Sequence, residues 1–153
     1  MIQRVGQLVN HNTEAKHLCH KITQRFNSLD IQPLNLSVAY LIWRKPYMAA
    51  GKGTFIDSML QKCGLNNSFA LDRYPEINMD MLAEARPDVI FLSSEPYPFK
   101  QKHVEELKKV LPQAKIILVD GELFSWYGSR LLYAPAYFKS LINDIRFNIK
   151  HDN

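Results

Sequence analysis

The fold prediction for this sequence starts from residues 87–99, PDVIFLSSEPYPF. Residues 89–92 are four consecutive apolar side chains, which is the pattern of a strand covered by helices on both faces. We therefore predict a central parallel strand here. Ligands of open α/β sheets bind beyond the carboxyl ends of such strands. The Ser-Ser-Glu tip at 93–95 and the aromatic loop at 96–99 are accordingly where we expect function to lie.

Two further apolar runs predict neighbouring strands. They are residues 36–43, LSVAYLIW, and residues 115–119, KIILV. Apolar side chains at helical spacing predict a long helix at 12–29, preceded by the end of another at 1–10, and further helices at 54–63, 79–85, 100–111, 129–133 and 135–148. Residues 44–53, 66–77 and 120–128 are expected to be loops. This alternation indicates an α/β fold: a parallel sheet flanked by helices in three layers, preceded by a long linker helix.

The composition is that of one globular domain with a single core. The chain has 153 residues, of which 46% are hydrophobic and 22% charged. The formal charge of +4 is spread along the sequence without a dense patch, so we expect no nucleic-acid partner. No apolar run approaches the roughly 20 residues of a membrane span, and Met1 is followed by an amphipathic segment in place of a signal peptide. Expressed as written, the chain is expected to stay in the cytoplasm.

The cysteines and histidines give little evidence for a disulfide or a metal. Cys19 and Cys63 are too few for a disulfide framework, and nothing in their spacing brings them together, so we predict two free thiols. His17 and His20 lie three apart on the predicted helix at 12–29. A metal between them would need a third ligand, which the sequence does not place nearby. We therefore predict no metal site.

The string GKGT at residues 51–54 invites comparison with a phosphate-binding loop. That motif requires a glycine where this chain has Pro46, and Ser or Thr directly after Lys52, where it has Gly53. A helix that begins behind two glycines can still meet an anionic group through its free backbone N–H donors. A plain strand-to-helix turn accounts for the string at least as well.

Three loops that follow predicted strands are expected to share one edge of the sheet: 43–52, 93–99 and 120–128. They carry seven aromatic side chains, Trp43, Tyr47, Tyr97, Phe99, Phe124, Trp126 and Tyr127. So many rings on one edge favour a face that holds something large and partly flat. We predict that Phe124 and Trp126 line this face, and that Trp43, at the end of an apolar strand, is at least partly core. The predicted ligand-binding residues are Trp43, Tyr47, Tyr97, Phe124, Trp126 and Tyr127.

No set of residues is placed for nucleophilic catalysis, and we predict no catalytic residue. Asp120 and Glu122 flank Gly121 and form a candidate carboxylate pair. Without a general-acid partner or metal ligands around them, a structural or docking role fits better. A small cytosolic α/β enzyme that uses Asp120 and Glu122 stays open as an alternative. A non-catalytic interaction domain is a second alternative.

Three strings of the sequence closely resemble one known family. They are AYLIWRKPYMAAGKGTFIDSML at 39–60, YPEINMDMLAEARPDVIFLSSEPYPF at 74–99 and LVDGELFSWYGSRLL at 118–132. The family is that of the helical-backbone metal receptors, class III periplasmic binding proteins of cobalamin and iron-siderophore ABC transporters, and the resemblance is to their C-terminal lobe. Residues 12–29 resemble the long helix that joins the two lobes. The resemblance implies a division into residues 1–30, the end of the N-terminal lobe with the linker helix, and residues 31–153, the C-terminal α/β lobe.

The resemblance implies a function in transport without catalysis and without a cofactor of the protein's own. The chain would be one lobe of the bilobal substrate-binding component of an ABC importer, periplasmic by family, with cobalamin or a metal chelate such as an iron-siderophore as ligand. It also implies a carboxylate that docks on arginines of the transmembrane permease. Our candidate is Glu95, whose alternative role is to cap the following helix. Asp80 stands where the family usually has Glu.

The sequence also departs from that family. A full receptor has a signal peptide and an N-terminal α/β lobe, and it binds its ligand in the cleft between the lobes. This sequence shows neither feature. We therefore expect a fragment, a separately expressed lobe that lacks its N-terminal partner, or a truncated reading frame.

Overall fold

The computed structural model describes the backbone of residues 1–151 and the side chains of residues 1–149. Contacts divide the chain into two compact units. Residues 1–32 together with 126–153 form one unit, and residues 33–125 form the other. The family resemblance implies a boundary near residue 30 between the two lobes of a full receptor. That boundary stays a prediction.

The unit of residues 33–125 is built on a six-stranded sheet with the path β4-β2-β1-β5-β6. Its parallel centre consists of β1 (Ser37–Trp43), β5 (Val89–Ser93) and β6 (Lys115–Val119), which are the three predicted strands. β5 lies between β1 and β6, and all five of its residues are buried. The prediction of a central strand at residues 89–92 is therefore confirmed.

Three short strands, which the sequence analysis left in loops, complete the sheet. β2 (Tyr47–Ala49) runs antiparallel to the carboxyl-terminal half of β1, and β4 (Glu76–Ile77) runs antiparallel to β2. β3 (Asn66–Asn67) pairs in parallel with the amino-terminal end of β1. The sheet is therefore mixed, with the predicted parallel strands at its centre and the antiparallel strands β2 and β4 at one edge. Strands of two or three residues are too short to show a periodic pattern in sequence.

One face of the sheet packs against two helices. Leu41 of β1 and Leu92 of β5 belong to a buried cluster that also holds Leu82 of α4 (Met79–Glu84) and Leu107 of α5 (Gln101–Val110). The side chain of Asn78 caps α4, since it accepts the N–H of Met81 at 2.8 Å.

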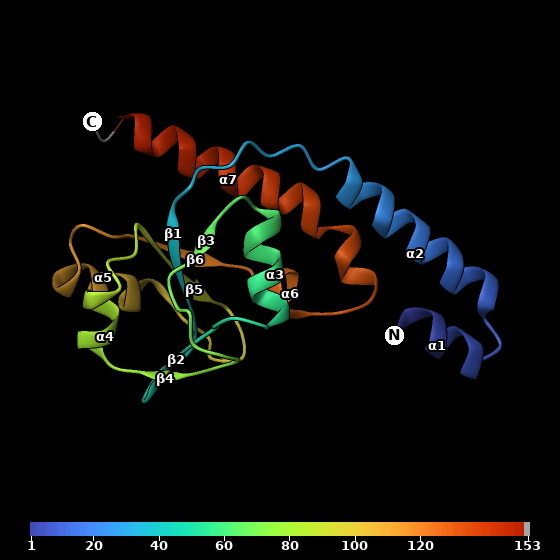
Figure 1. Cartoon of the computed structure of the whole chain (residues 1–153), viewed down its shortest axis with the longest axis horizontal. Helices are drawn as coiled ribbons and strands as arrows, with labels where there is room; N and C mark the ends of the chain where they lie inside the picture. The colour runs from blue at the N-terminus through green and yellow to red at the C-terminus, as the bar shows by residue number, and fades with distance from the viewer. Residues whose placement is uncertain (152–153) are drawn as a thin grey trace. The chain divides into compact units, whose positions relative to one another are not determined.

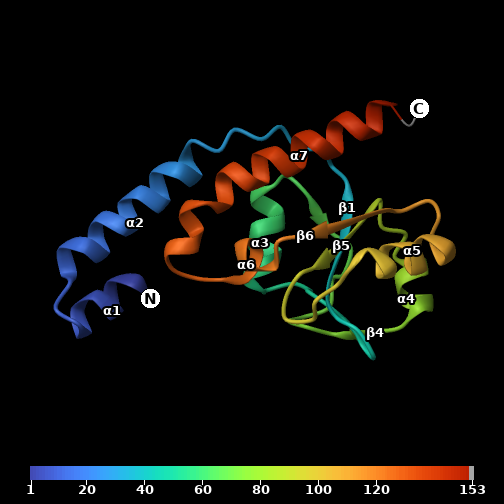
Figure 2. The same cartoon turned by 180° about the vertical axis from the view of Figure 1, so that it is seen from behind.

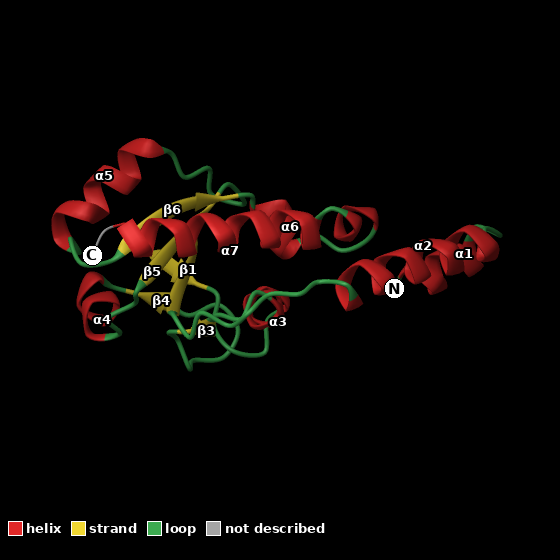
Figure 3. Ribbon diagram, turned by 90° about the horizontal axis from the view of Figure 1, so that it is seen from above, coloured by secondary structure: helices red, strands yellow, loops and turns green. Residues whose placement is uncertain are grey.

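The opposite face carries an aromatic core. Tyr40 and Phe91 are fully buried and pack edge to face, with ring centroids 6.2 Å apart. Because side chains alternate along a strand, these residues point away from Leu41 and Leu92. Figure 3 shows α4 and α5 on one side of the sheet, and α3 (Phe55–Lys62) with α6 (Gly121–Ser125) on the other. The predicted three-layer arrangement is confirmed within this unit.

The second unit is helical. α1 (Ile2–Leu8) lies beside α2 (Asn12–Asn27), as Figures 1 and 2 show, and Ala15 and Ile22 of the predicted apolar stripe of α2 are buried. α7 (Ala134–His151) follows the 3₁₀ helix η1 (Ser129–Leu132), and Pro135 lies in its first turn as predicted. Arg25 of α2 donates a hydrogen bond to the carbonyl oxygen of Leu132 at 2.6 Å, which ties α2 to η1.

Two further observations concern the chain as described. No helix among the described residues is long and apolar enough to cross a membrane. Cys19 and Cys63 are both free thiols, as predicted, and burial raises the pKa of the Cys63 thiol.

Candidate functional site

The carboxyl ends of β1 and β5 bring a group of aromatic rings together. Trp43 ends β1, and Tyr97 lies in the loop that follows β5. Their rings meet edge to face with centroids 5.7 Å apart, and Tyr97 meets buried Phe99 at 4.8 Å. Trp43 is 39% exposed and Tyr97 is half-buried. The group therefore has a buried base at Phe99 and presents the rings of Trp43 and Tyr97 outward.

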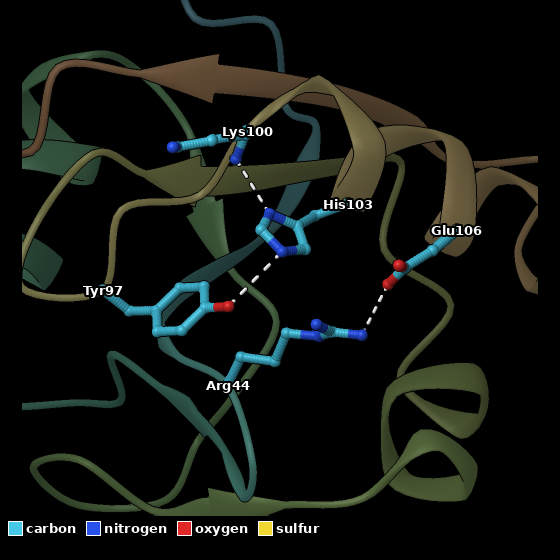
Figure 4. A network of polar contacts seen from close by, with 5 residues as sticks. All are labelled: Arg44, Tyr97, Lys100, His103 and Glu106. Carbon is cyan, nitrogen blue, oxygen red and sulfur yellow. Dashed lines mark hydrogen bonds and ion pairs between the residues drawn. The ribbon is translucent and has the colours of Figure 1, made fainter.

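His103 supports Tyr97 from the first turn of α5. It is only 2% exposed, and its Nδ1 accepts the backbone N–H of Lys100 at 2.8 Å. Its Nε2 lies 3.3 Å from the hydroxyl oxygen of Tyr97 (Figure 4). Burial, and next the positive charge of Arg44, lower the pKa of His103. The imidazole is therefore neutral at neutral pH and is a buried part of α5 that contacts the loop.

Arg44 adds a positive charge beside the same rings. Its Nη2 donates to Oε2 of Glu106 at 2.6 Å (Figure 4). Hydrogen bonding to Tyr47, and next to Tyr97, raises the pKa of Arg44. Its Nε is buried without a hydrogen-bond partner among the described residues. A guanidinium between aromatic rings suits a ligand with anionic or electron-rich groups.

Tyr47 joins this site through β2. It pairs with Ile77 of β4 and packs partly buried against the same core cluster as Tyr97. Of the six predicted ligand-binding residues, the structure therefore brings Trp43, Tyr47 and Tyr97 together around Arg44. The prediction that Trp43 is partly core is wrong: Trp43 is 39% exposed and does not belong to the buried cluster, and its ring contacts Tyr97 at the surface.

Phe124 does not lie on this face, and the prediction that it does is wrong. It is fully buried, and its ring centroid lies 5.2 Å from that of Tyr40 and 5.9 Å from that of Phe91. We expected a loop at this position, but residues 121–125 form α6. A helix of five residues turns Phe124 toward the sheet, where it fills the aromatic core.

Asp120 has a structural role that explains this helix. Its Oδ1 accepts the N–H of Glu122 at 3.0 Å and that of Leu123 at 3.4 Å, so it caps the first turn of α6. A carboxylate held in this way stabilises the N-terminus of a helix. The arrangement agrees with the structural role that we favoured for the Asp120 and Glu122 pair.

Trp126 and Tyr127 belong to the other compact unit. They are 47% and 57% exposed, and Tyr127 borders a cavity of about 220 Å³ with Met1, Cys19 and Leu131. Their role in ligand binding stays a prediction.

The loop after β5 is fixed by the start of α6. The buried Ser93 hydroxyl accepts a hydrogen bond from Tyr40 at 3.1 Å, and the N–H of Gly121 donates to Oγ of Ser94 at 2.9 Å. A Cβ atom on Gly121 would lie 2.3 Å from Oγ of Ser93 and 2.9 Å from the backbone nitrogen of Glu95. Only glycine fits at this close approach.

Glu95 lies half-buried in the same loop, before the cis peptide bond that joins it to Pro96. It does not cap the following helix, because the N-cap of α5 is Lys100. The alternative structural role that we considered for Glu95 is therefore wrong. Its role as a docking carboxylate stays a prediction.

Two backbone donors of the GKGT string are in use. The N–H of Gly51 donates to the carbonyl oxygen of Arg73 at 2.7 Å, and that of Lys52 donates to the carbonyl oxygen of Leu71 at 2.8 Å. Thr54 caps α3 by accepting the N–H of Asp57 at 3.0 Å. This geometry supports the simple strand-to-helix turn over a phosphate site. Among the described residues, no group of three His, Cys, Asp or Glu side chains could hold a metal.

Sequence reasoning missed Arg44 and His103 as parts of the site. His103 belongs to the charged stretch at 100–109, where a solvated face is the simplest interpretation. Helical spacing from Leu107 predicts that Val110 points inward, but Val110 is 58% exposed, and the inward face of α5 holds His103 and Leu107. The position of His103 was the available signal. A side-chain acceptor three residues after an N-cap residue can accept the backbone N–H of that residue, as His103 does from Lys100.

The fold is similar to that of several solved binding proteins. One is described as a possible iron-binding (periplasmic solute-binding) protein from Staphylococcus epidermidis ATCC 12228, with a TM-score of 0.71 and 23% identity over 94% of this chain and 59% of that chain. For the periplasmic heme-binding protein RhuT from Roseiflexus sp. RS-1, the TM-score is 0.72 and the identity is 18%, over 92% of this chain and 61% of that chain. For the periplasmic vitamin B12 binding protein BtuF of Vibrio cholerae, the TM-score is 0.60 and the identity is 17%, over 94% of this chain and 55% of that chain. This chain therefore spans about three fifths of the length of these proteins or less.

Comparison with curated protein sequences found no match. The family model described as periplasmic binding protein matches residues 1–116. This match covers the helices α1 and α2 and the sheet up to the start of β6. The chain therefore belongs to the periplasmic binding protein family, and its α/β fold matches one lobe of such a protein.

Proposed function

We propose that this chain is a ligand-binding lobe of the substrate-binding component of an ABC importer, and that its ligand is a corrinoid or a metal chelate such as heme or a ferric hydroxamate. The observation that carries the proposal is the position of Trp43, Tyr97 and Arg44. They stand together beyond the carboxyl ends of β1 and β5, where open α/β sheets bind their ligands.

The chemistry of these side chains suits this ligand class. The exposed ring of Trp43 and the half-buried ring of Tyr97 offer apolar surface to a macrocycle or chelate, and the Arg44 guanidinium offers charge to its acidic groups. Two solved proteins of similar fold are named as heme-binding and vitamin B12-binding proteins, and a third is named as an ABC-type Fe³⁺-hydroxamate transport system. That range supports the class of ligand and leaves its exact identity open to the experiment below.

The proposed role is binding without catalysis and without a resident cofactor, in the periplasm where the family works. The alternative of an enzyme that uses Asp120 and Glu122 gains no support, since Asp120 caps α6. The partners in this proposal are the ligand, the transmembrane permease subunits of the importer, and an N-terminal lobe of the family type.

Glu95 is the proposed docking carboxylate for the permease. It lies in the loop after β5, and the residues on both sides of it in sequence are exposed. Charge reversal in Glu95→Lys should abolish cross-linking of the chain to vesicles that carry the cognate importer. Glu76→Lys, on the short strand β4, is the matched control and should leave cross-linking intact. Equal loss in both variants would contradict the assignment.

Fluorescence tests the ligand directly, because the chain has two tryptophans. In a Trp126→Phe background, emission reports on Trp43 alone. We expect saturable quenching by at least one of cyanocobalamin, hemin or a ferric trihydroxamate, and weaker binding after Tyr97→Leu. Tyr74→Leu removes an exposed tyrosine of the same unit and serves as the control. Absence of saturable quenching with all three probes would overturn the proposed function.

A further inference from the structure

We propose that His103 is a positioning residue that fixes the hydroxyl of Tyr97 as a hydrogen-bond donor toward the ligand, an inference that rests on the proposed function. Both ring nitrogens of His103 have partners. Nδ1 faces the backbone N–H of Lys100 at 2.8 Å, and Nε2 faces the Tyr97 hydroxyl at 3.3 Å (Figure 4).

The backbone contact settles which nitrogen carries the proton. A backbone N–H can only donate, so Nδ1 of His103 must present its lone pair to Lys100. In a neutral imidazole the hydrogen then lies on Nε2. His103 therefore donates to the oxygen of Tyr97, and the tyrosine hydrogen points to an acceptor other than the imidazole.

Arg44 is a second group near Tyr97 that cannot accept its hydrogen. Its interaction with Tyr97 contributes to the raised pKa of Arg44, and a guanidinium has donors only. With His103 donating to the oxygen and Arg44 unable to accept, the Tyr97 hydroxyl is left as a donor for an incoming oxygen acceptor. Carboxylate, hydroxamate and amide oxygens are acceptors of this kind, and they occur in the proposed ligand class.

Burial makes the arrangement rigid. His103 is 2% exposed, and its ring lies edge to face against both Tyr97 and Phe99, with centroids 5.5 Å apart in each case. The ring therefore cannot flip to offer a different nitrogen without breaking the cap of α5. The Tyr97 ring is held in turn by Trp43 and Phe99.

The same geometry predicts a pH response. A proton on Nδ1 would point at the N–H of Lys100, so protonated His103 cannot keep both contacts. The charged groups that act on it are Lys100, Lys102 and Glu106 from α5 and Arg44 from the end of β1. Three of these four are cations, which oppose protonation. Once the proton is bound, the Tyr97 hydroxyl loses its fixed direction and ligand affinity falls.

Two substitutions separate positioning from structure. His103→Asn keeps an acceptor oxygen at the place of Nδ1 but does not reach Tyr97. His103→Gln can place its amide nitrogen where Nε2 stood. We expect His103→Asn and Tyr97→Phe each to weaken the binding of the quenching probe by about 3- to 10-fold, the range of one neutral hydrogen bond. The double variant should be no weaker than either, and His103→Gln should recover most of the affinity.

Titrations use hemin, cyanocobalamin and a ferric trihydroxamate separately, each at about pH 5 and about pH 7.5, on either side of the usual pKa of histidine. The wild-type chain should lose affinity at the lower pH more than either His103 variant does. Equal affinity of the Asn and Gln variants, or additive losses in the double variant, would overturn the positioning role.

A nitrogen-detected NMR spectrum of the free wild-type chain keeps this inference separate from the proposed function. It should show His103 as the neutral tautomer with hydrogen on Nε2. Finding the Nδ1–H tautomer would overturn the inference whatever the chain binds. Failure of the wild-type chain to bind any of the three probes would instead overturn the proposed function, and the donor role toward a ligand with it.

Discussion

Tyr97 connects the side chains of the candidate site. Its ring contacts Trp43 and Phe99, its hydroxyl contacts His103, and its backbone N–H donates to the carbonyl oxygen of Ile42 at 3.3 Å. The loop after β5 is thereby joined to the end of β1. At the scale of single residues, the function that we propose depends on this tyrosine and on the groups that direct its hydroxyl.

Phe124 gives the first prediction at this scale. Because it is fully buried among the rings of Tyr40 and Phe91, Phe124→Ala should lower the free energy of unfolding by about 3 to 5 kcal/mol. Trp126→Ala removes a larger ring that is 47% exposed, and it should cost much less. Urea denaturation of both variants measures the difference. Equal losses would show that Trp126 is as much a core residue as Phe124.

His103 predicts how stability depends on pH. Burial lowers its folded-state pKa below the usual 6.5, so between these two values the unfolded chain binds more protons than the folded chain. The free energy of unfolding therefore rises with pH through this window, and this contribution is lost as the pH falls below 6.5. His103→Asn should remove it, so the gap in stability between about pH 5 and about pH 7 should be smaller in the variant than in the wild type. A gap of the same size in both proteins would contradict the prediction.

The sequence predicts single residues well only where a long pattern surrounds them. The N-cap of Asn78 could be predicted because an apolar helix pattern follows it. Phe124 lies in a helix of five residues, which is too short for its buried side to be read from spacing. The role of His103 depends on a contact with Tyr97 in the preceding loop and on the charge of Arg44 after β1. Helical spacing within α5 does not indicate either interaction.

At the scale of elements, length decides what sequence reasoning can find. β1, β5 and β6 are five to seven residues long and apolar, and all three were predicted. β2, β3 and β4 have two or three residues, and backbone pairing with neighbouring strands forms them. This pairing matters for function, because β2 carries Tyr47 to the site.

The junction between the β5 loop and α6 gives a prediction at the element scale. Gly121→Ala places a Cβ atom 2.3 Å from Oγ of Ser93, so we expect a loss of about 1 to 3 kcal/mol in the free energy of unfolding. Ser93→Ala removes that oxygen, and the cost of Gly121→Ala should be smaller in its background. Chemical denaturation of the two single variants and the double variant measures the coupling. Strictly additive costs would show that the crowding lies elsewhere.

At the scale of the whole molecule, the proposed ligand site is an open face. Small-molecule sites usually bury most of the surface of their ligand. Trp43, Tyr47, Tyr97 and Arg44 all lie at one edge of one sheet, and the proteins of similar fold are longer than this chain. The fold and the family were predictable from the sequence because the quoted strings are distributed along residues 39–132. The identity of the ligand was not, because aromatic rings and one guanidinium suit corrinoids, heme and ferric chelates alike.

The affinity of the 153-residue polypeptide alone should therefore be weak. A face that covers part of a ligand gains less than an enclosing cleft, and the cost of association is nearly the same, so we expect a Kd on the order of 10 µM or weaker. Titration calorimetry with the probe that quenches Trp43 measures it. A sub-micromolar Kd would mean that this chain encloses its ligand without a second lobe.

The most direct test of the central claim is a map of where a ligand sits on the chain. A ferric trihydroxamate is paramagnetic and broadens the NMR signals of nearby nuclei. The account predicts that it selectively broadens the backbone amides of Trp43, Tyr47 and Tyr97 and the indole N–H of Trp43, and that Tyr97→Leu reduces this effect. Selective broadening that is confined to residues 1–32 and 126–149, or no selective broadening by the ferric chelate together with no shift changes on adding cyanocobalamin, would contradict it.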